Sequence, residues 1–272
     1  MSNFTLYTTP LSANGRKVLA VCHHLGLRPE IKLINVYKGE GRAPEYLAVN
    51  PLGKIPALVE GDFVLWESNA ILQYLAEAHG DYRLWSREPA RRADIARWLY
   101  WESAEWQPAL VSVLRGAVAS KLGLLPPGTP VTTDYGDARF VGLARFVDAH
   151  LATRRCLLGD ELTIADFSVA GMLTYARAAE FPFTDFANLT AWYERIEALS
   201  AWQETATSPW AVICCLTLRS AVSIASADSG RAAGSRDSAF STKSSRGFGM
   251  SLRCIRRGST SGFLLQQRPI PS

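Results

Sequence analysis

Two short polar segments stand directly before stretches with a helical pattern, and both carry side chains that could bind a charged ligand. Residues 8–15 hold Ser12 and Asn14, and the second segment ends in Glu67 and Ser68. The free N–H groups at the start of a helix attract anions. Ser68 therefore suits a carboxylate, and the neighbouring Glu67 suits an ammonium group. The structural alternative is that these side chains only cap helices or complement a helix dipole.

Strand and helix patterns alternate over residues 1–80. The β-rich runs are 4–7, 31–34, 55–59 and 63–65, and the expected helices begin after Gly15, near Pro44 and at Ser68. The sequence Glu60-Gly-Asp between the last two runs is typical of a hairpin. An order of β-α-β-α-β-β-α combines a βαβ unit with a hairpin. It predicts an α/β domain with a mixed four-stranded sheet.

Strand patterns disappear after Pro89, and apolar residues recur at helical spacing over residues 89–210. We therefore expect an all-α second domain, reached through a linker at 80–88. Within it, Pro108 predicts a kink in a long helix, and residues 122–128 predict a turn. The segment 163–166, TIAD, predicts a capped helix start, and a last helix is expected over 189–199.

The last 60 residues, 213–272, differ in composition from the rest of the chain. They contain nine Lys and Arg against two Asp, a net charge of +7, whereas residues 1–212 contain twenty against twenty-three Asp and Glu, a net charge of −3. This tail also holds 13 serines and no Glu, Tyr or Trp. Such a composition is typical of a low-complexity, largely disordered segment. Because the tail has no compact basic cluster beyond Arg256 and Arg257, we expect no nucleic-acid partner.

The overall composition is that of a soluble globular protein, with 48% hydrophobic and 20% charged residues. No apolar run approaches the roughly 20 residues that a membrane span needs, and the first residues lack the pattern of a secretory signal. Five scattered cysteines argue against a disulfide framework and for a reducing compartment. These features lead us to expect a cytoplasmic protein without a membrane partner.

Three motifs, in this order, resemble those of the cytosolic-type glutathione transferases. Residues 50–58, NPLGKIPAL, resemble the segment with the family's cis-proline, and residues 67–75, ESNAILQYL, resemble the glutamate-serine helix start that follows it. Residues 163–167, TIADF, are similar to the capping motif of the family's C-terminal domain. The resemblance covers about residues 1–210. It implies a thioredoxin-like N-terminal domain and an all-α helical-bundle C-terminal domain.

The same resemblance implies a binding site for glutathione, which is a tripeptide. A cis bond before Pro56 would let Ile55 present its N–H and C=O to the extended tripeptide, as in β-augmentation. Ser68 would bind the α-carboxylate of the γ-glutamyl group and Glu67 its ammonium. Lys54 could meet the glycyl carboxylate, or could be a solvated turn lysine.

Ser12 resembles the catalytic serine of the theta-like, serine-type classes, because it stands four residues before the helix residues 16–18, RKV. Asn14 is the other candidate donor to the glutathione sulfur, and Tyr7 lies too far back to resemble a catalytic tyrosine. The loop has no cysteine, which disfavours a mixed-disulfide mechanism, and Cys22 is expected to pack in the core. Related serine-type enzymes often place His or Gln where this chain has Arg42, which could take over a carboxylate contact.

The second substrate would lie against the helical domain. Trp106 and Gln107 belong to an aromatic cluster that could line an apolar pocket for an electrophile. The cluster could equally be interdomain core or a dimer interface.

The resemblance thus implies a homodimeric glutathione transferase that conjugates electrophiles or reduces peroxides. Glutathione would be a co-substrate, and no metal or permanently bound cofactor is expected. A non-catalytic assembly module and a glutathione-dependent disulfide reductase remain alternatives.

Overall fold

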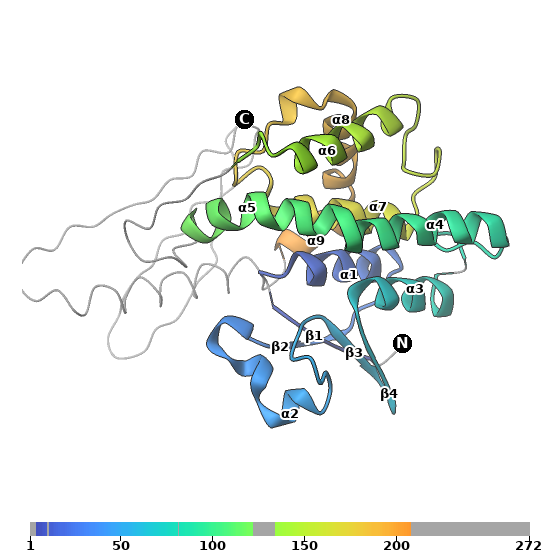
Figure 1. Ribbon diagram of the computed structural model, residues 1–272. Helices are drawn as coiled ribbons and strands as arrows, with labels where there is room; N and C mark the ends of the chain where they lie inside the picture. Colours follow the sequence, from blue (N-terminus) through green and yellow to red (C-terminus); the bar gives the residue numbers. More distant parts are fainter. Residues whose placement is uncertain (1–3, 10, 81, 122–133, 208–272) are drawn as a thin grey trace, which may run out of the picture. The chain divides into compact units, whose positions relative to one another are not determined.

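The computed structural model describes residues 4–9, 11–80, 82–121 and 134–207 (Figure 1). All of them belong to the first of two compact units, Met1–Ser226. The turn predicted at 122–128 and the disordered tail predicted at 213–272 lie outside the described residues. The domain boundaries at 80, 89 and 210 stay predictions.

The N-terminal part is built on a four-stranded mixed sheet. Its strands are β1 (Thr5–Thr8), β2 (Glu30–Leu33), β3 (Ala57–Glu60) and β4 (Phe63–Trp66), in the order β2-β1-β3-β4. β1 runs parallel to β2 and antiparallel to β3, which pairs with β4 as a hairpin. The sheet predicted from the βαβ-hairpin pattern is therefore confirmed, with strand ends shifted by one or two residues.

Helices connect and cover these strands. They are α1 (Ala13–His24), the 3-10 turns η1 (Val36–Lys38) and η2 (Glu40–Arg42), α2 (Pro44–Leu47) and α3 (Ser68–Ala78). Figure 1 shows α1 and α3 between the sheet and the helical part, with α2 on the other side of the sheet. The apolar face of α1 is completely buried at Val18, Val21 and Cys22, because sheet and helices enclose it.

The rest of the described chain is helical, as predicted. Its elements are α4 (Pro89–Trp101), η3 (Glu102–Trp106), α5 (Gln107–Lys121), α6 (Ala138–Leu151), α7 (Ile164–Gly171), η4 (Met172–Tyr175), η5 (Phe183–Asp185), α8 (Ala187–Glu197) and α9 (Ser200–Thr207). The capping box is present, since the Thr163 N–H donates to Asp166 Oδ2 over 2.9 Å. Helix α9 was not expected, because two turns are too short to show a clear period.

The irregularity expected at Pro108 takes the form of a π-helical turn. Residues Glu102–Trp106 wind more widely than an α-helix immediately before it. Proline lacks an N–H group, and its ring would clash with the carbonyl of Ala104, four residues earlier. A wider turn at this point relieves that clash without ending the helix.

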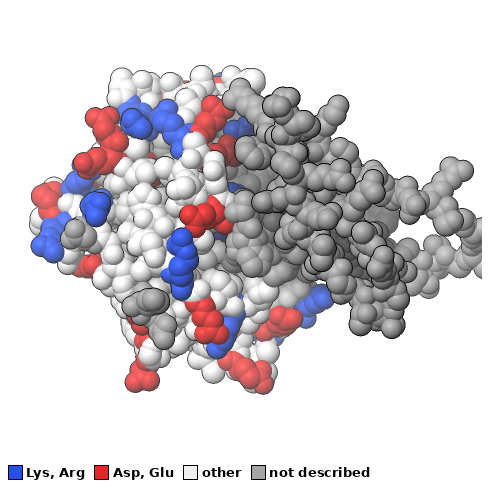
Figure 2. Space-filling model, turned by 180° about the vertical axis from the view of Figure 1, so that it is seen from behind, with Lys and Arg blue, Asp and Glu red and all other residues white. Residues whose placement is uncertain are grey.

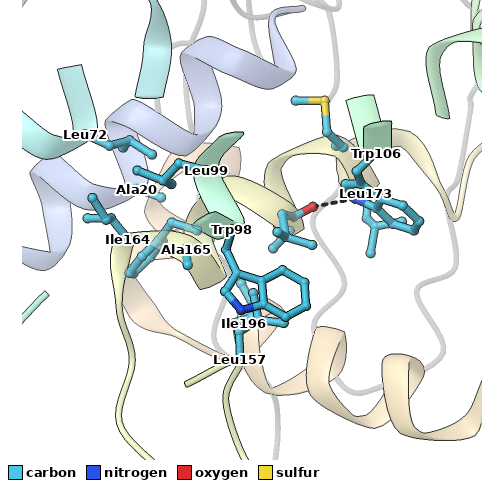
Figure 3. Packing of buried hydrophobic residues seen from close by; sticks show 14 of the residues in the cluster. Ala20, Leu72, Trp98, Leu99, Trp106, Leu157, Ile164, Ala165, Leu173 and Ile196 are labelled. Carbon is cyan, nitrogen blue, oxygen red and sulfur yellow. Dashed lines mark hydrogen bonds between the residues drawn. The ribbon is translucent and has the colours of Figure 1, made fainter. Parts of the chain in front are cut away.

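One hydrophobic core joins the sheet-covering helices to the helical part. In Figure 3, Ala20 of α1 and Leu72 of α3 lie beside Leu99 of α4 and Ile164 of α7. The contacts of α1 with α7 and α9 extend the same core. The thioredoxin-like part and the helical part therefore bury their apolar faces against each other.

Charged side chains lie mainly on the outside. Figure 2 shows Lys and Arg scattered among Asp and Glu over one face of the molecule. Lys17 and Glu102 are different, since both are completely buried. No helix in the described ranges is long and apolar enough to cross a membrane.

Candidate active site

The strand register gathers three segments of the N-terminal part at one end of the sheet: the loop that holds Ser12, the Ile55–Pro56 segment and the helix start at Glu67. Ala57, the first residue of β3, pairs with Tyr7 near the end of β1 and with Trp66 at the end of β4. These three segments therefore meet at this end of the sheet: the loop after β1, the Ile55–Pro56 segment before β3 and Glu67 after β4. Their strands are neighbours or next neighbours, and neighbouring strands lie about 5 Å apart. Segments almost 60 positions apart in sequence thus form one surface.

Ser12 occupies the N-cap position of α1. Its backbone is extended, and its Oγ accepts a hydrogen bond from the Gly15 N–H over 2.9 Å. The capping role expected as the structural alternative is therefore present. A hydroxyl that accepts one hydrogen bond still has its own hydrogen to donate, so capping and donation to a sulfur are compatible. The first turn of α1 contains no acidic residue, which suits an anion at this helix start.

Asn14 and Ser68 connect the two helix starts directly. Ser68 Oγ donates to Asn14 Oδ1 over 3.2 Å, so α1 and α3 begin side by side. Ser68 is buried, with 8% of its surface exposed. Because the Asn14 carbonyl oxygen accepts this bond, the amide NH₂ of Asn14 is left to donate.

Glu67 has an unusual backbone conformation directly before α3. Its φ is 72°, and its side chain makes no capping bond to the helix. A non-glycine residue in this region costs of order 1–3 kcal/mol and persists only where the surroundings hold it. Because the exposed carboxylate of Glu67 does not cap α3, it is available to bind a ligand.

The Ile55–Pro56 peptide bond is cis, as the resemblance implied. The backbone just before this bond is held by two side chains, one from α2 and one from the segment that follows α2. The Tyr46 hydroxyl and the Asn50 amide both donate to the Lys54 carbonyl, over 2.5 and 2.7 Å. These two hydrogen bonds therefore link the segment before β3 to α2 and the residues after it.

Arg42 and Lys54 are brought close together by a contact between two glycines. An added Cβ on Gly41 would lie 2.4 Å from the Gly53 carbonyl oxygen, and one on Gly53 would lie 2.4 Å from that of Gly41. Only glycine permits such a close backbone approach. Arg42 and Lys54, both exposed, directly follow these two glycines, so their backbones lie near each other, and Lys54 directly precedes Ile55.

The structure places Trp106 differently from the predicted pocket wall. Its side chain has no exposed surface and donates from Nε1 to the Val169 carbonyl over 3.1 Å, as the dashed line in Figure 3 shows. Of the alternatives left open by the sequence, core packing is the one that the structure shows. Gln107 is half-buried.

Neither cysteine of the described ranges offers a reactive thiol. Cys22 and Cys156 are both free and buried. Burial raises the pKa of the Cys22 thiol to about 12 and that of Cys156 to about 11. The packing role predicted for Cys22 is confirmed. Within the described ranges, no three His, Cys, Asp or Glu residues come together as a metal site.

Comparison with known proteins decides the family. Residues 2–77 match the model for the glutathione S-transferase N-terminal domain, and residues 105–195 match that for the glutathione S-transferase C-terminal domain. This chain belongs to the glutathione S-transferase family. The first matched segment covers almost all of the sheet-based part, and the second lies within the helical part described above.

Individual family members show the same extent of similarity. Glutathione S-transferase GstB of Escherichia coli K12 is 32% identical over 209 residues, covering 75% of this chain and 98% of the relative. Glutathione S-transferase F10 of Arabidopsis thaliana is 28% identical over 74% of this chain and 94% of the relative. The crystal structure of glutathione transferase F7 from Populus trichocarpa superposes with a TM-score of 0.67 at 26% identity, covering 75% of this chain and 98% of that one.

Several residues that shape the site of this family member were not predicted. Tyr46 fixes the Lys54 backbone, and Asn69, Lys17 and Glu102 form a buried polar cluster behind Ser68. One signal was available for Glu102, which stands on the same helical face as Ile95, Trp98 and Leu99. A charged residue at a core-facing position is rare unless it is paired.

Proposed function

We propose that this protein binds glutathione at the end of the sheet and either joins it to an electrophile through its sulfur, displacing the leaving group, or uses it to reduce a peroxide. The observation that carries the proposal is the meeting of the Ser12 loop, Ile55 and Ser68 at one end of the sheet. In this proposal Ile55 pairs with the tripeptide backbone, while Ser68 and Glu67 bind the γ-glutamyl carboxylate and ammonium. Arg42 and Lys54 attract the glycyl carboxylate.

The thiol of glutathione must lose its proton to react. Its ordinary pKa is near 8.5, so most of it is protonated at neutral pH. Lowering that pKa by two units requires about 2.7 kcal/mol of preferential stabilisation of the thiolate. A hydrogen bond from the Ser12 hydroxyl together with the N-terminus of α1 supplies energy of that order. Catalysis then consists of positioning the thiolate and stabilising its charge.

The test is retention of the full chain on immobilised glutathione, followed by assays with a chlorinated aromatic and with a hydroperoxide. We expect retention, and activity toward at least one of these substrates. Ser12→Ala should lower kcat/KM about 100-fold, which is typical for loss of a donor to a developing anion, while Asn14→Ala should have a smaller effect. Binding without either activity would favour an assembly module or a disulfide reductase. No binding would overturn the proposal.

The loss of the Ser12 hydroxyl has to be separated from the loss of its cap. Ser12→Gly serves this purpose, since glycine at an N-cap costs only a few tenths of a kcal/mol. If the thiolate needs the hydroxyl, Ser12→Gly should be as inactive as Ser12→Ala and nearly as stable as the wild type. Full activity of Ser12→Gly would assign the donor role to Asn14.

We also propose that the protein acts as a homodimer in the cytoplasm. Large apolar side chains are exposed on the edge strand β4, at Phe63, Val64 and Trp66, and on α4 and α6, at Tyr100 and Phe146. Groups of exposed apolar residues often mark interfaces, and free thiols suit a reducing compartment. Light scattering coupled to size-exclusion chromatography should give twice the chain mass. Monomer at micromolar concentration would contradict the dimer.

A further inference from the structure

Three arginines gather where the end of α6 meets α8. Arg154 and Arg155 follow the last turn of α6, Arg195 belongs to α8, and all three are exposed. Figure 1 shows α6 and α8 side by side, and the two helices are in contact. The three arginines and Asn188 line a depression of about 490 Å³, and none of the described residues that line it is acidic. This basic depression therefore carries positive charge only.

The arginines of the basic depression form no ion pair with any carboxylate in the part of the chain that the structure describes. Arg154 donates to the His150 carbonyl over 2.8 Å, and Arg195 donates to the Arg155 carbonyl over 2.9 Å. A guanidinium group has five N–H donors in a fork that fits phosphate oxygens. The two carbonyl contacts use few of these donors, so the depression suits a phosphate group.

A second hollow, of about 390 Å³, adjoins the basic depression, because Arg155 and Arg195 line both of them. Five large apolar side chains form much of its wall, namely those of Leu84, Leu162, Trp192, Ile196 and Leu199. Arg83, Asp160 and Glu161 also line it, so its charges are of both signs. Because apolar walls and nearby carboxylates both disfavour an anion, this apolar cavity favours an uncharged apolar group.

The two hollows lie far from the proposed glutathione site. His24, the last residue of α1, lines the apolar cavity, whereas Ser12 caps the first turn of the same helix. The 12 residues of α1, at about 1.5 Å each, separate these two positions by about 18 Å. A molecule in the hollows therefore leaves the surface formed by the Ser12 loop, Ile55 and Ser68 open to glutathione.

We infer that the basic depression and the apolar cavity together form a binding site for an organic phosphate. The phosphate group lies on Arg154, Arg155 and Arg195, and an aromatic or short acyl group enters the apolar cavity. This orientation follows from the lining of the two hollows, since acidic residues line only the second one. Inorganic phosphate fills only the first hollow, and a neutral apolar molecule fills only the second. The inference goes beyond the proposed function and does not depend on it.

The test is isothermal titration of the full chain with 1-naphthyl phosphate, with and without saturating S-hexylglutathione. We expect binding in both cases, at least about tenfold tighter than that of inorganic phosphate or 1-naphthol, because linking two binding groups makes the second contact intramolecular. Arg155→Gln and Arg195→Gln should each weaken binding about tenfold, a loss typical of a hydrogen bond to a charged group. The loss should shrink as the salt concentration rises, since the arginines are exposed.

Arg145→Gln is the matched control. Arg145 is an exposed arginine of α6 that lines neither hollow, so this variant loses the same charge and should bind like the wild type. Arg195→Gln also removes the bond to the Arg155 carbonyl. Arg155→Gln is therefore the deciding variant, because the Arg155 side chain makes no hydrogen bond to another described residue, and its fold is checked by circular dichroism.

Four results would overturn the inference. They are no binding of 1-naphthyl phosphate, wild-type affinity in Arg155→Gln, an equal loss in Arg145→Gln, and displacement of the ligand by S-hexylglutathione. Inorganic phosphate or 1-naphthol binding as tightly as 1-naphthyl phosphate would also overturn it, because one of the two hollows would then contribute nothing. None of these results bears on the proposed function, which is tested by retention on immobilised glutathione.

Discussion

Ser68 donates a hydrogen bond to Asn14 over 3.2 Å, across 54 positions of the sequence. This bond makes the start of α3 and the start of α1 parts of one site. The proposed anion-binding hydroxyl therefore lies next to the loop that holds the proposed sulfur donors.

Ser68→Ala should raise the KM for glutathione about tenfold or more and change kcat less. The hydroxyl is expected to leave Asn14 and donate to the γ-glutamyl carboxylate, and a hydrogen bond to a charged group contributes about 1.5–3 kcal/mol. Isothermal titration with glutathione gives the affinity directly. Ser112→Ala, which removes a local hydroxyl bond on α5, is the control and should bind like the wild type. Equal affinities for both variants would exclude the Ser68 contact.

Arg42→Gln and Lys54→Gln should each weaken glutathione binding about threefold to tenfold, with the larger effect at low salt. Exposed charges are screened by ions, so the difference from the wild type should shrink as the salt concentration rises. Binding of γ-glutamylcysteine, which lacks the glycyl group, should not respond to either substitution. A loss of affinity for both ligands would show that these cations contact another part of glutathione.

Gly15→Ala should damage both stability and activity. An added Cβ would lie 2.0 Å from Thr8 Oγ1 and 3.2 Å from Ser12 Cβ, and overpacking of this kind costs about 1–3 kcal/mol. The free energy of unfolding in urea and kcat/KM for glutathione are the two measurements. Because the clash involves the Thr8 side chain, Thr8→Ala should recover part of the loss.

The same change of glycine to alanine at position 142 should have the opposite effect on stability. No atom lies within 4 Å of an added Cβ at this position in α6. Alanine inside a helix is about 0.5–1 kcal/mol more favourable than glycine, so this variant should be more stable and equally active. If Gly15→Ala and Gly142→Ala lowered the free energy of unfolding equally, the close packing described around Gly15 in the Ser12 loop would be wrong.

The N-cap of α4 should make part of the stability depend on pH. Glu88 accepts hydrogen bonds from the Ala90 and Arg91 N–H groups, and these bonds lower its pKa below the ordinary value of 4.5. A lowered pKa means that the folded state prefers the carboxylate. The stabilisation is therefore complete above pH 4.5 and is lost as the pH falls through the lower, folded-state pKa.

Glu88→Ala should accordingly have a lower melting temperature than the wild type at neutral pH, and the difference should narrow below pH 4.5. The measurement is thermal unfolding between pH 3 and 7. A constant difference across this range would assign the effect of Glu88 to something other than its charge.

Much of this structure follows from local patterns in the sequence. The alternation of strand and helix, the hairpin at Glu60-Gly-Asp62 and the capping box at Thr163 all depend on residues within one or two turns of each other. Such short-range preferences act before tertiary contacts form, and in this chain they agree with the final fold. The cis bond before Pro56 is different, because it was implied only by the resemblance of residues 50–58 to the family's motif.

Other features depend on which surfaces meet, and no local pattern contains that information. Trp106 and Glu102 stand close to Pro108 in the sequence. Only the packing against α7 shows that Trp106 is closed off from solvent, and only the packing against α1 shows that Glu102 pairs with Lys17. The close approach of Gly41 to Gly53 likewise depends on which backbone segments meet in the folded chain.

The sequence by itself thus determined the elements, the family resemblance and the residues that could bind glutathione. The tertiary structure decided which of those residues share one site, and which polar groups stand behind them. The physical reason is that burying a donor or a charge costs free energy, which a partner in the right place offsets. That partner, as for Ser68 with Asn14 and Lys17 with Glu102, comes from a distant part of the chain.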